Sequence, residues 1–342
     1  MANSVGLKEV AAHAGVSYKT VSRVSNGDSA VREETRQRVL ESIKALGYRP
    51  NHSAQSLRRG STRTIRLILY LREDQHRYER FQDEIIAAVI DRTSAADYSL
   101  LLEVYGDHET PEQMARFGDS RSDGVVVLDG RVESRIVPML ATARIPTAVL
   151  ANPNASLDRG MMDADFFGGA FEMVNHLIGL GHRRIAHVAD HMHIYSSFLR
   201  RDGYLQALRE AGIEPDPDLV LIAGSSRAHG YEAAKVLFER DPSITAMFCV
   251  NDLTAFGVME FARERGISVP GDLSVTGYDD ISLAKHATPP LTTIHIPWYE
   301  MAALAVDEVI AVAGSGASFT QRTFPVQLCI RETTGPARSR AN

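Results

Sequence analysis

The chain has 342 residues, which is enough for two or three domains rather than one hydrophobic core. Its apolar and charged fractions are 44% and 23%, as in an ordinary globular protein, and no window approaches the apolar length of a membrane span. The start of the chain lacks a signal-peptide core, and Cys249 and Cys329 are too few for a disulfide framework or a cysteine metal site. We therefore expect a cytoplasmic protein without a membrane partner.

Charge is distributed unevenly along the chain. Residues 1–60 contain ten Lys and Arg against five Asp and Glu, a net charge of +5, which leaves 27 basic and 38 acidic residues, or −11, in the remainder. A basic segment attracts phosphate and an acidic one repels it. Any contact with nucleic acid is therefore expected in the first sixty residues.

Helical periodicity is clear in this basic segment. Leu7, Val10, Ala11 and Ala14 recur at the spacing of one helix face, and Gly15 follows as a left-handed cap. A later helix is predicted over about 32–46, with Val39, Ile43 and Leu46 on its apolar face and Gly47 and Pro50 at its end.

A short helix between these two is the candidate recognition helix. Ser17 is a favoured N-cap, and Val21 and Val24 lie on the side that packs. The opposite side presents Tyr18, Lys19, Ser22, Arg23 and Asn26. Polar side chains at the exposed start of an anchored helix are what insertion into a DNA major groove requires. The three helices together predict a helix-turn-helix domain.

The segment after Pro50 allows two interpretations. Asn51 can cap one or two helical turns that place Ala54 and Leu57 on one face, before Arg58 and Arg59. So short a helix forms only when packed or bound. A leucine beside arginines suits a wedge that opens a minor-groove base step, but composition alone is equally consistent with a simple linker.

These residues resemble the N-terminal domain of the LacI/GalR family of bacterial transcription regulators. The resemblance lies in LKEVAAHAGVSYKTVSRVSN (residues 7–26), Thr35-Arg36 and LGYRPN (residues 46–51). It implies a homodimer that reads a pseudo-palindromic, double-stranded operator, and it favours the minor-groove wedge at residues 54 and 57. The DNA-binding positions it implies, together with those read from the helix, are Leu7, Ser17, Tyr18, Lys19, Thr20, Ser22, Arg23, Asn26, Tyr48, Asn51, Ala54, Leu57 and Arg58. One departure is Arg32, where the family usually has a capping Ser or Asp.

From residue 64 onward, apolar strands alternate with amphipathic helices. The predicted strands are 65–70, 99–104, 125–128, 147–151, 184–189, 219–222, 246–250 and 274–278. The predicted helices include 81–95, 169–180, 200–211, 230–240 and 252–265. This alternation predicts an α/β fold with two parallel sheets, each covered by helices on both faces.

Polar side chains follow several of these strands. In open parallel sheets, ligands bind beyond the carboxyl ends of the strands. The rule selects Asn251, Asp252, Asp279, Asp280 and Arg200, with Tyr70, Arg72, Asp74, Tyr105, Asp107, Asp129 and Asn152 at neighbouring ends. Converging Asn, Asp and Arg side chains suit a small polyhydroxylated ligand, although helix capping and Asx turns are the commoner use of each single residue.

The resemblance to the LacI/GalR family continues through this part. Its landmarks are LGHRRI (residues 180–185), Arg200 with Gly203-Tyr204, Asn251-Asp252, GYDD (residues 277–280) and PPLTTI (residues 289–294). It implies a two-lobed effector domain similar to periplasmic sugar-binding proteins, whose last crossover falls near residues 295–298. The effector-binding positions implied or suggested are Asp165, Arg200, Asn251, Asp279 and Trp298. For Trp298, stacking on a sugar ring and packing at the crossover are both open.

The expected organisation is a DNA-binding domain over 1–50, a hinge helix and linker over 51–62, and an effector and dimerisation domain over 63–342. Its N-lobe is expected at about 63–180 and 296–322, and its C-lobe at about 181–295 and 323–342. Residues 72–78 depart from the turn that is usual in the family. The ligand contacts on the N-lobe side of the pocket therefore cannot be inferred from the family.

Other functions are less consistent with the sequence. His187, Asp190, His191 and His193 lie close together, but their spacing does not place three of them on one face, so no metal is expected. No nucleophile elbow or phosphate-binding glycine loop occurs, so we expect neither catalytic residues nor a cofactor. We predict a repressor controlled by a sugar-like effector. The alternatives are a ligand-binding protein without regulatory DNA activity and a sugar-processing enzyme.

Overall fold

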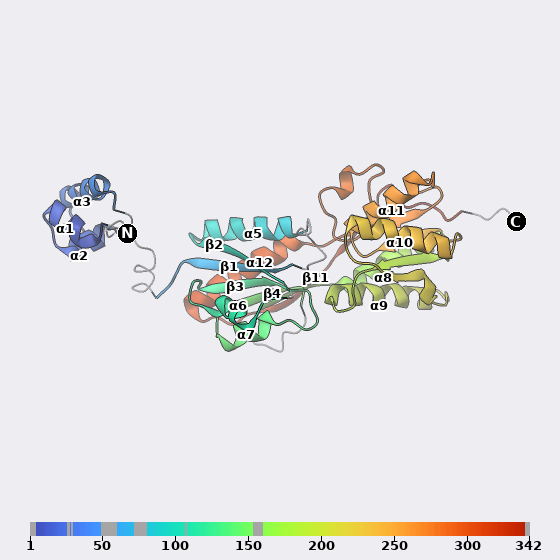
Figure 1. The fold of residues 1–342 in the computed structure, drawn as a ribbon, viewed down its shortest axis with the longest axis horizontal. Coiled ribbons are helices and arrows are strands. Elements are labelled where there is room, and N and C mark those ends of the chain that lie inside the picture. Colours follow the sequence, from blue (N-terminus) through green and yellow to red (C-terminus); the bar gives the residue numbers. More distant parts are fainter. Residues whose placement is uncertain are drawn as a thin grey trace. The chain divides into compact units, whose positions relative to one another are not determined.

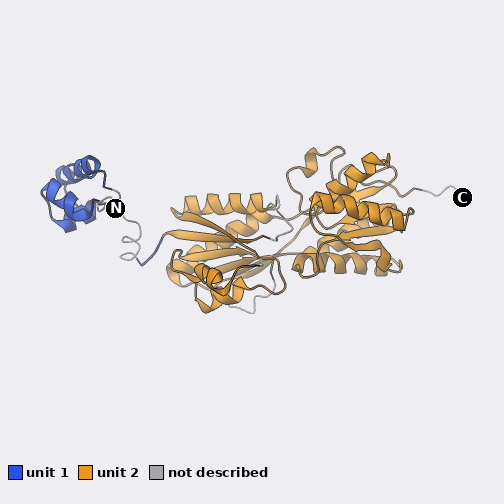
Figure 2. Cartoon of the chain, in the orientation of Figure 1, with its two compact units in different colours: residues 1–62 blue, residues 63–342 orange. Residues whose placement is uncertain are grey.

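The computed structural model describes residues 5–25, 28, 30–48, 60–71, 81–106, 108–152 and 160–338. The chain divides into two compact units, residues 1–62 and 63–342, coloured separately in Figure 2. Several predictions fall outside the described residues: the roles of Asn26, Asn51, Ala54, Leu57 and Arg58, the hinge helix, and the turn at 72–80.

The N-terminal unit contains the three predicted helices, α1 (Leu7–Ala14), α2 (Tyr18–Ser25) and α3 (Glu33–Leu46). Gly15 and Gly47 end α1 and α3 in the left-handed conformation, with φ of 62° and 60°. The core that joins the helices consists of Val10, Ala11, Ala14, Val21, Val24 and Val39. Arg32 makes no side-chain cap at the start of α3, as its departure from the family pattern predicts.

The first lobe of the second unit contains a parallel sheet in the order β11-β5-β4-β3-β1-β2. Its strands are β1 (Thr64–Tyr70), β2 (Ser99–Tyr105), β3 (Gly124–Leu128), β4 (Thr147–Leu150), β5 (Gly160–Ala164) and β11 (Gln321–Phe324). Alternate residues of β1 point to opposite faces. Ile65 and Leu67 pack with α5 (Gln82–Ala95) and α12 (Trp298–Ser315), whereas Ile68 packs with α7 (Ile136–Thr142). The short helix α6 (Pro111–Ala115) and the 3₁₀ turn Arg116–Gly118 precede β3.

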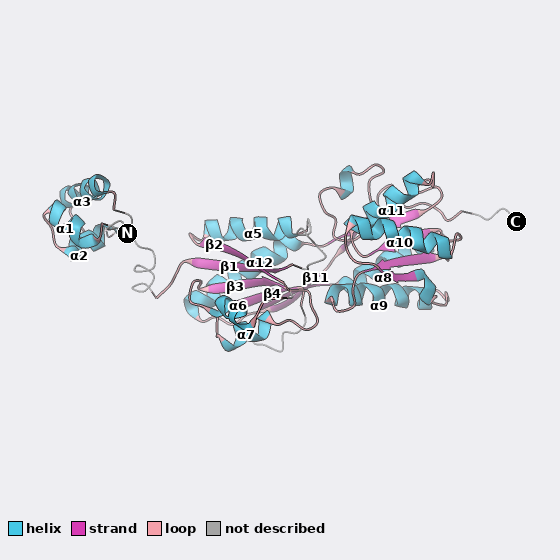
Figure 3. Cartoon of the chain, viewed as in Figure 1, coloured by secondary structure: helices cyan, strands magenta, loops and turns pink. Residues whose placement is uncertain are grey.

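The second lobe contains a parallel sheet in the order β7-β6-β8-β9. Its strands are β6 (Ile185–Ala189), β7 (Val220–Ile222), β8 (Ala246–Cys249) and β9 (Ser274–Thr276). Helices α8 (Phe166–Gly179) and α9 (Tyr195–Glu210) pack on one face, and α10 (Arg227–Arg240) and α11 (Asp252–Glu264) on the other (Figure 1). The expectation of two helix-covered parallel sheets is confirmed (Figure 3). None of the helices described is long and apolar enough to cross a lipid bilayer.

Three crossovers connect the lobes. They follow β5, β10 (Thr293–His295) and β11, and β10 pairs antiparallel with β12 (Gln327–Cys329). The expected N-lobe segment to residue 180 differs from the structure, because α8 packs against α9 in the second lobe. The crossover near 295–298 is likewise not the last, since β11 pairs with β5 before the chain returns to β12. Strand β5, GMMDA, escaped prediction because it has no β-branched or aromatic residue.

Candidate functional site

Helix α2 presents the polar face expected of a recognition helix. Its start is capped by Ser17, whose Oγ accepts from the backbone N–H of Thr20 at 3.1 Å. Val21 and Val24 are buried, while Tyr18 is 42% exposed and Lys19 and Arg23 are also exposed. The capped end and the buried valines hold these side chains at the surface.

Asp28 is a residue of this surface that the sequence did not single out. The Arg23 Nε lies 2.7 Å from the Asp28 carboxylate, and Arg36 donates to the Asp28 backbone carbonyl. Hydrogen bonding by Arg23 lowers the pKa of Asp28 below its usual value. The ion pair therefore orients the Arg23 guanidinium before any DNA is present. The only sign of this pair in the sequence is an acidic residue placed shortly after the end of the helix.

The remaining predicted DNA-binding residues of this unit differ in exposure. Leu7 and Tyr48 are half-buried and pack against the helical core. Thr20 and Ser22 are half-buried on α2, and the Thr20 hydroxyl lies 2.9 Å from the Ser17 hydroxyl. Leu7 and Tyr48 thus have a packing role in addition to any contact with DNA.

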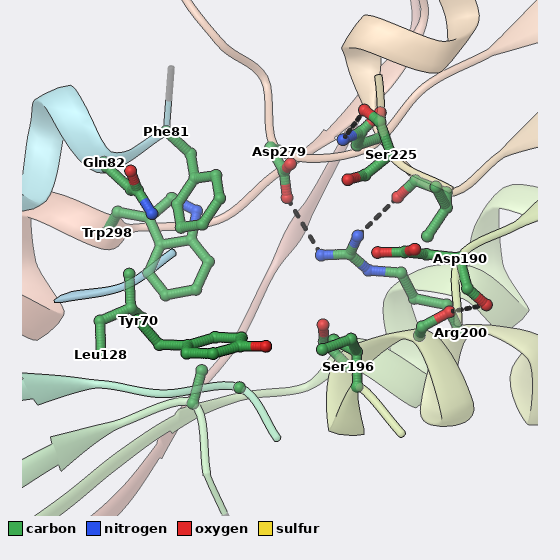
Figure 4. A pocket seen from close by; sticks show the side chains of 16 residues that line it. Tyr70, Phe81, Gln82, Leu128, Asp190, Ser196, Arg200, Ser225, Asp279 and Trp298 are labelled. Atoms are coloured by element: carbon green, nitrogen blue, oxygen red, sulfur yellow. Dashed lines mark hydrogen bonds and ion pairs between the residues drawn. The ribbon is translucent and has the colours of Figure 1, made fainter. Parts of the chain in front are cut away.

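A pocket lies between the two lobes of the second unit (Figure 4). Its lining residues are Tyr70, Phe81, Gln82, Leu128, Gly130, Ala151, Asp190, Ile194, Ser196, Ser197, Arg200, Ser225, Val250, Asn251, Asp279 and Trp298. Most of them follow strand ends or start helices, as the rule for open parallel sheets predicts. Four of the five predicted effector residues, all except Asp165, line this pocket.

Arg200 is at the centre of the C-lobe wall of the pocket. Its Nη2 lies 3.0 Å from the Asp279 carboxylate, Nη1 donates to the Val250 carbonyl, and the guanidinium carbon stands 4.0 Å from the Tyr278 ring centroid. Burial raises the pKa of Asp279 to about 6, although Arg200 opposes the shift. The pair supplies an oriented cation and a carboxylate at one point of the wall.

Asn251 occupies the pocket and also caps a helix. Its Oδ1 accepts from the Thr254 N–H at 2.9 Å, and its Nδ2 donates to the Ser225 carbonyl at 2.9 Å. The sequence left capping and ligand binding open for this residue, and capping is observed. Asn251 also lines the pocket.

Asp165 is not part of the pocket lining. Its carboxylate accepts from the N–H of Gly168 at 2.8 Å and so caps α8. In the structure this residue acts as a helix cap.

The N-lobe wall of the pocket is aromatic. Trp298 is 3% exposed, with its ring centroid 4.9 Å from that of Phe81 and 6.3 Å from that of Phe166. It both packs at the crossover and lines the pocket. Sequence reasoning named Tyr70 here but missed Phe81 and Gln82, because they follow residues 72–78, where the sequence departs from the family pattern.

Three further predicted strand-end residues form an internal network instead. The Tyr105 hydroxyl donates to Asp129 at 2.5 Å, and Arg131 Nε lies 3.0 Å from the same carboxylate. The Asn152 amide donates to the Arg131 carbonyl at 3.0 Å. All four side chains are buried, and none of them lines the pocket. The network holds the loop after β3 in place.

That loop connects the lobes across the mouth of the pocket. Val132 N–H donates to the His193 carbonyl and Tyr195 N–H to the Gly130 carbonyl, both at 2.8 Å. The Tyr195 hydroxyl also donates to Asp163 at 3.2 Å. The described conformation therefore has the lobes hydrogen-bonded to each other beside the pocket.

Of the histidines considered as metal ligands, His191 and His193 stack with ring centroids 5.5 Å apart, and His187 lies in a strand. His187 is fully buried in β6, with Nδ1 2.9 Å from the Phe248 carbonyl, whereas His193 belongs to the loop before α9. Within the described ranges, no three ligating side chains gather in a metal-binding arrangement.

A helix-turn-helix unit followed by a two-lobed domain with a polar pocket defines a ligand-responsive transcription regulator. The profile described as "Bacterial regulatory proteins, lacI family" matches residues 6–51, and that of the "Periplasmic binding protein-like domain" matches residues 174–334. The HTH-type transcriptional repressor PurR of Haemophilus influenzae (strain PittEE) is 33% identical over 84% of this chain and 85% of its own length. The regulator CelR of Thermobifida fusca is 32% identical over 96% of this chain and 97% of its own length.

Solved structures agree with these sequence relatives. The lac repressor dimer bound to operator and an anti-inducer superposes with a TM-score of 0.84 and 26% identity, covering 97% of this chain and all of the other. A CelR–cellobiose complex superposes with a TM-score of 0.72 and 30% identity, covering 96% of this chain and 99% of the other. The chain therefore belongs to the lacI family of bacterial regulatory proteins. It is a DNA-binding transcription regulator and not an enzyme.

Proposed function

We propose that this protein is a cytoplasmic repressor whose affinity for a pseudo-palindromic, double-stranded operator is set by a small polyhydroxylated effector. The observation that carries the proposal is the pocket, whose C-lobe wall combines Arg200, Asp279 and Asn251. Related structures support it, since one is of a lac repressor dimer bound to operator and another is of CelR in complex with cellobiose. By the same likeness, we propose a homodimer.

The chemistry of the two walls suits a sugar-like ring. The C-lobe wall supplies guanidinium donors, a carboxylate acceptor and the hydroxyls of Ser196 and Ser197, which together can satisfy several ligand hydroxyls. The aromatic side chains opposite can cover the apolar face of such a ring.

The proposed control mechanism uses the division expected from the sequence: a DNA-binding domain at 1–50, a hinge and linker at 51–62, and an effector domain at 63–342. Effector binding changes the relation between the lobes, whose hydrogen bonds across the pocket mouth are the two-state element. The change alters the spacing of the two hinges in the dimer, so that the hinge helices order or melt.

The direct test is a thermal-shift screen of the full chain against neutral sugars and sugar acids, followed by mobility shifts on operator DNA with each ligand that stabilises it. We expect at least one ligand to raise the melting temperature and to change operator affinity. A ligand that stabilises the protein without changing operator affinity would contradict a regulatory role for the pocket.

Arg23 is proposed to contact a base edge, since α2 presents its guanidinium at the surface, directed by Asp28. The change Arg23→Ala is expected to reduce discrimination among operator variants by about 1 to 3 kcal/mol, because a bidentate base contact is lost. Competition mobility shifts measure this. Lys8→Ala, exposed on α1, is the control, and unchanged discrimination in Arg23→Ala would refute the assignment.

Leu57 lies outside the described residues and is proposed, from the sequence, as a minor-groove wedge. The change Leu57→Gly removes the wedge and weakens the local helix, so operator affinity is expected to fall by about tenfold or more. Binding to nonspecific DNA, which depends on phosphate contacts, should change little. Equal losses on operator and on random-sequence DNA would show that the residue is only part of a linker.

A further inference from the structure

Three buried polar atoms in the pocket have no hydrogen-bond partner in the part of the chain that the structure describes. They are Gln82 Oε1, Trp298 Nε1 and Arg200 Nε. All three side chains line the pocket and are 5%, 3% and 5% exposed, respectively. A buried polar group without a partner destabilises the protein, and at a pocket a bound ligand is the group that can supply the partner.

Two of these atoms belong to one wall. Gln82 is the first residue of α5, and Trp298 is the first residue of α12, the helix that packs beside α5. Figure 4 shows both side chains on the side of the pocket opposite Arg200 and Asp279. Phe81 precedes Gln82 and packs against the Trp298 ring. An unpartnered acceptor and an unpartnered donor therefore share a wall that is otherwise aromatic.

The two atoms have complementary requirements. A glutamine carbonyl oxygen only accepts a hydrogen bond, and an indole N–H only donates one. A hydroxyl group can do both at once. A phosphate or carboxylate oxygen could accept from the indole but would leave the glutamine oxygen unpaired and facing a negative charge. An ammonium group could donate to the glutamine but would leave the indole N–H unpaired.

We propose that Gln82 and Trp298 form a hydroxyl-selecting subsite for a neutral polyol that lies against the aromatic wall and whose hydroxyls donate to Gln82 Oε1 and accept from Trp298 Nε1. The inference rests on the proposed function and names the N-lobe determinant of its effector. Gln82 becomes a specificity-determining residue, and the Arg200–Asp279 pair serves the opposite side of the same ligand.

The first experiment needs no ligand. The change Gln82→Met removes the unpaired oxygen and keeps the length of the side chain, so the melting temperature of the full-length protein should rise by about 2 to 4 °C. The matched control is Gln206→Met, since Gln206 is on α9 and its amide already donates to Glu210 at 2.8 Å. The control should show no rise. A fall for Gln82→Met would overturn the proposal, because it would mean that the glutamine is already satisfied.

The second experiment uses cellobiose, D-ribose and D-glucose as probes, with glucose 6-phosphate as the anionic counterpart. For each neutral sugar that binds the wild type, Gln82→Met and Trp298→Phe should each raise the dissociation constant by about tenfold or more. Gln82→Glu keeps an acceptor oxygen and should retain binding. Matching affinities for wild type and Gln82→Met, or tighter binding of the phosphate ester than of glucose, would overturn the subsite.

The two experiments separate this inference from the proposed function. If no neutral sugar binds the wild type, the proposed effector class fails, and the melting temperatures of Gln82→Met and Gln206→Met alone decide whether an unpaired acceptor exists. If sugars bind and the variants bind them equally well, the effector class stands and the subsite fails.

Discussion

Replacing Arg200 with alanine is expected to abolish the response of operator binding to the effector. The guanidinium is the only side-chain cation among the described lining residues, and its loss leaves the Asp279 carboxylate buried without its partner. Removing one member of a buried ion pair typically costs about 3 to 5 kcal/mol of folding free energy. Mobility shifts with and without effector measure the response, and denaturant unfolding measures the stability.

A double variant separates ligand binding from stability. Arg200→Met with Asp279→Asn removes both charges, so most of the lost folding free energy should return while the effector response remains absent. Operator binding without effector should persist in the double variant, because neither side chain belongs to the N-terminal unit. A double variant that still responds to effector would show that the pair is structural only.

Replacing Arg66 with alanine is expected to lower the free energy of unfolding by about 3 to 5 kcal/mol. Arg66 lies in β1 with no exposed surface, and its guanidinium pairs with Asp119 at 2.5 Å and Glu103 at 3.3 Å. It also donates to the Phe117 carbonyl at 2.7 Å. Alanine would leave two carboxylates and a carbonyl without this partner in the first lobe.

The matched control for Arg66 is Arg121. It pairs with the same two carboxylates, at 2.5 Å from Asp119 and 3.0 Å from Glu103, but its side chain is 49% exposed. Solvent screens such pairs, so Arg121→Ala should cost about 1 kcal/mol or less. Urea unfolding of Arg66→Ala and Arg121→Ala measures the free energy of unfolding that each variant loses. Similar losses for the two arginines would mean that burial does not determine the contribution of the network.

Local patterns in the sequence predicted the elements well, because the forces that define them act within one or two helical turns. Ser17 caps α2, and Gly15 and Gly47 end their helices, as predicted. The strand-end rule also brought Arg200 and Asn251 to one pocket, since parallel strands deliver their carboxyl ends to a common edge. The same rule would have selected Asp190, which directly follows β6.

Contacts between distant residues were beyond such patterns. Arg66 sits in an apolar strand of the sequence, and nothing local shows that its partners come from β2 and the turn after residue 118. Helix α8 was expected in the N-lobe by its order in the chain, but its packing places it in the other lobe. Asp165 resembles a pocket acid by position, yet it caps α8 outside the lining.

The helix-turn-helix unit, the two parallel sheets and the family could be predicted from the residues alone, because periodicity, caps and motifs are local properties of the chain. Which side chains meet in the pocket depends instead on tertiary packing. Arg200 and Asp279 are 79 positions apart in the sequence. Gln82 and Trp298 begin helices that lie near the two ends of the second unit's sequence, although these helices pack side by side. Their partners, and the absence of partners, depend on how the lobes and crossovers pack, which no short stretch of sequence encodes.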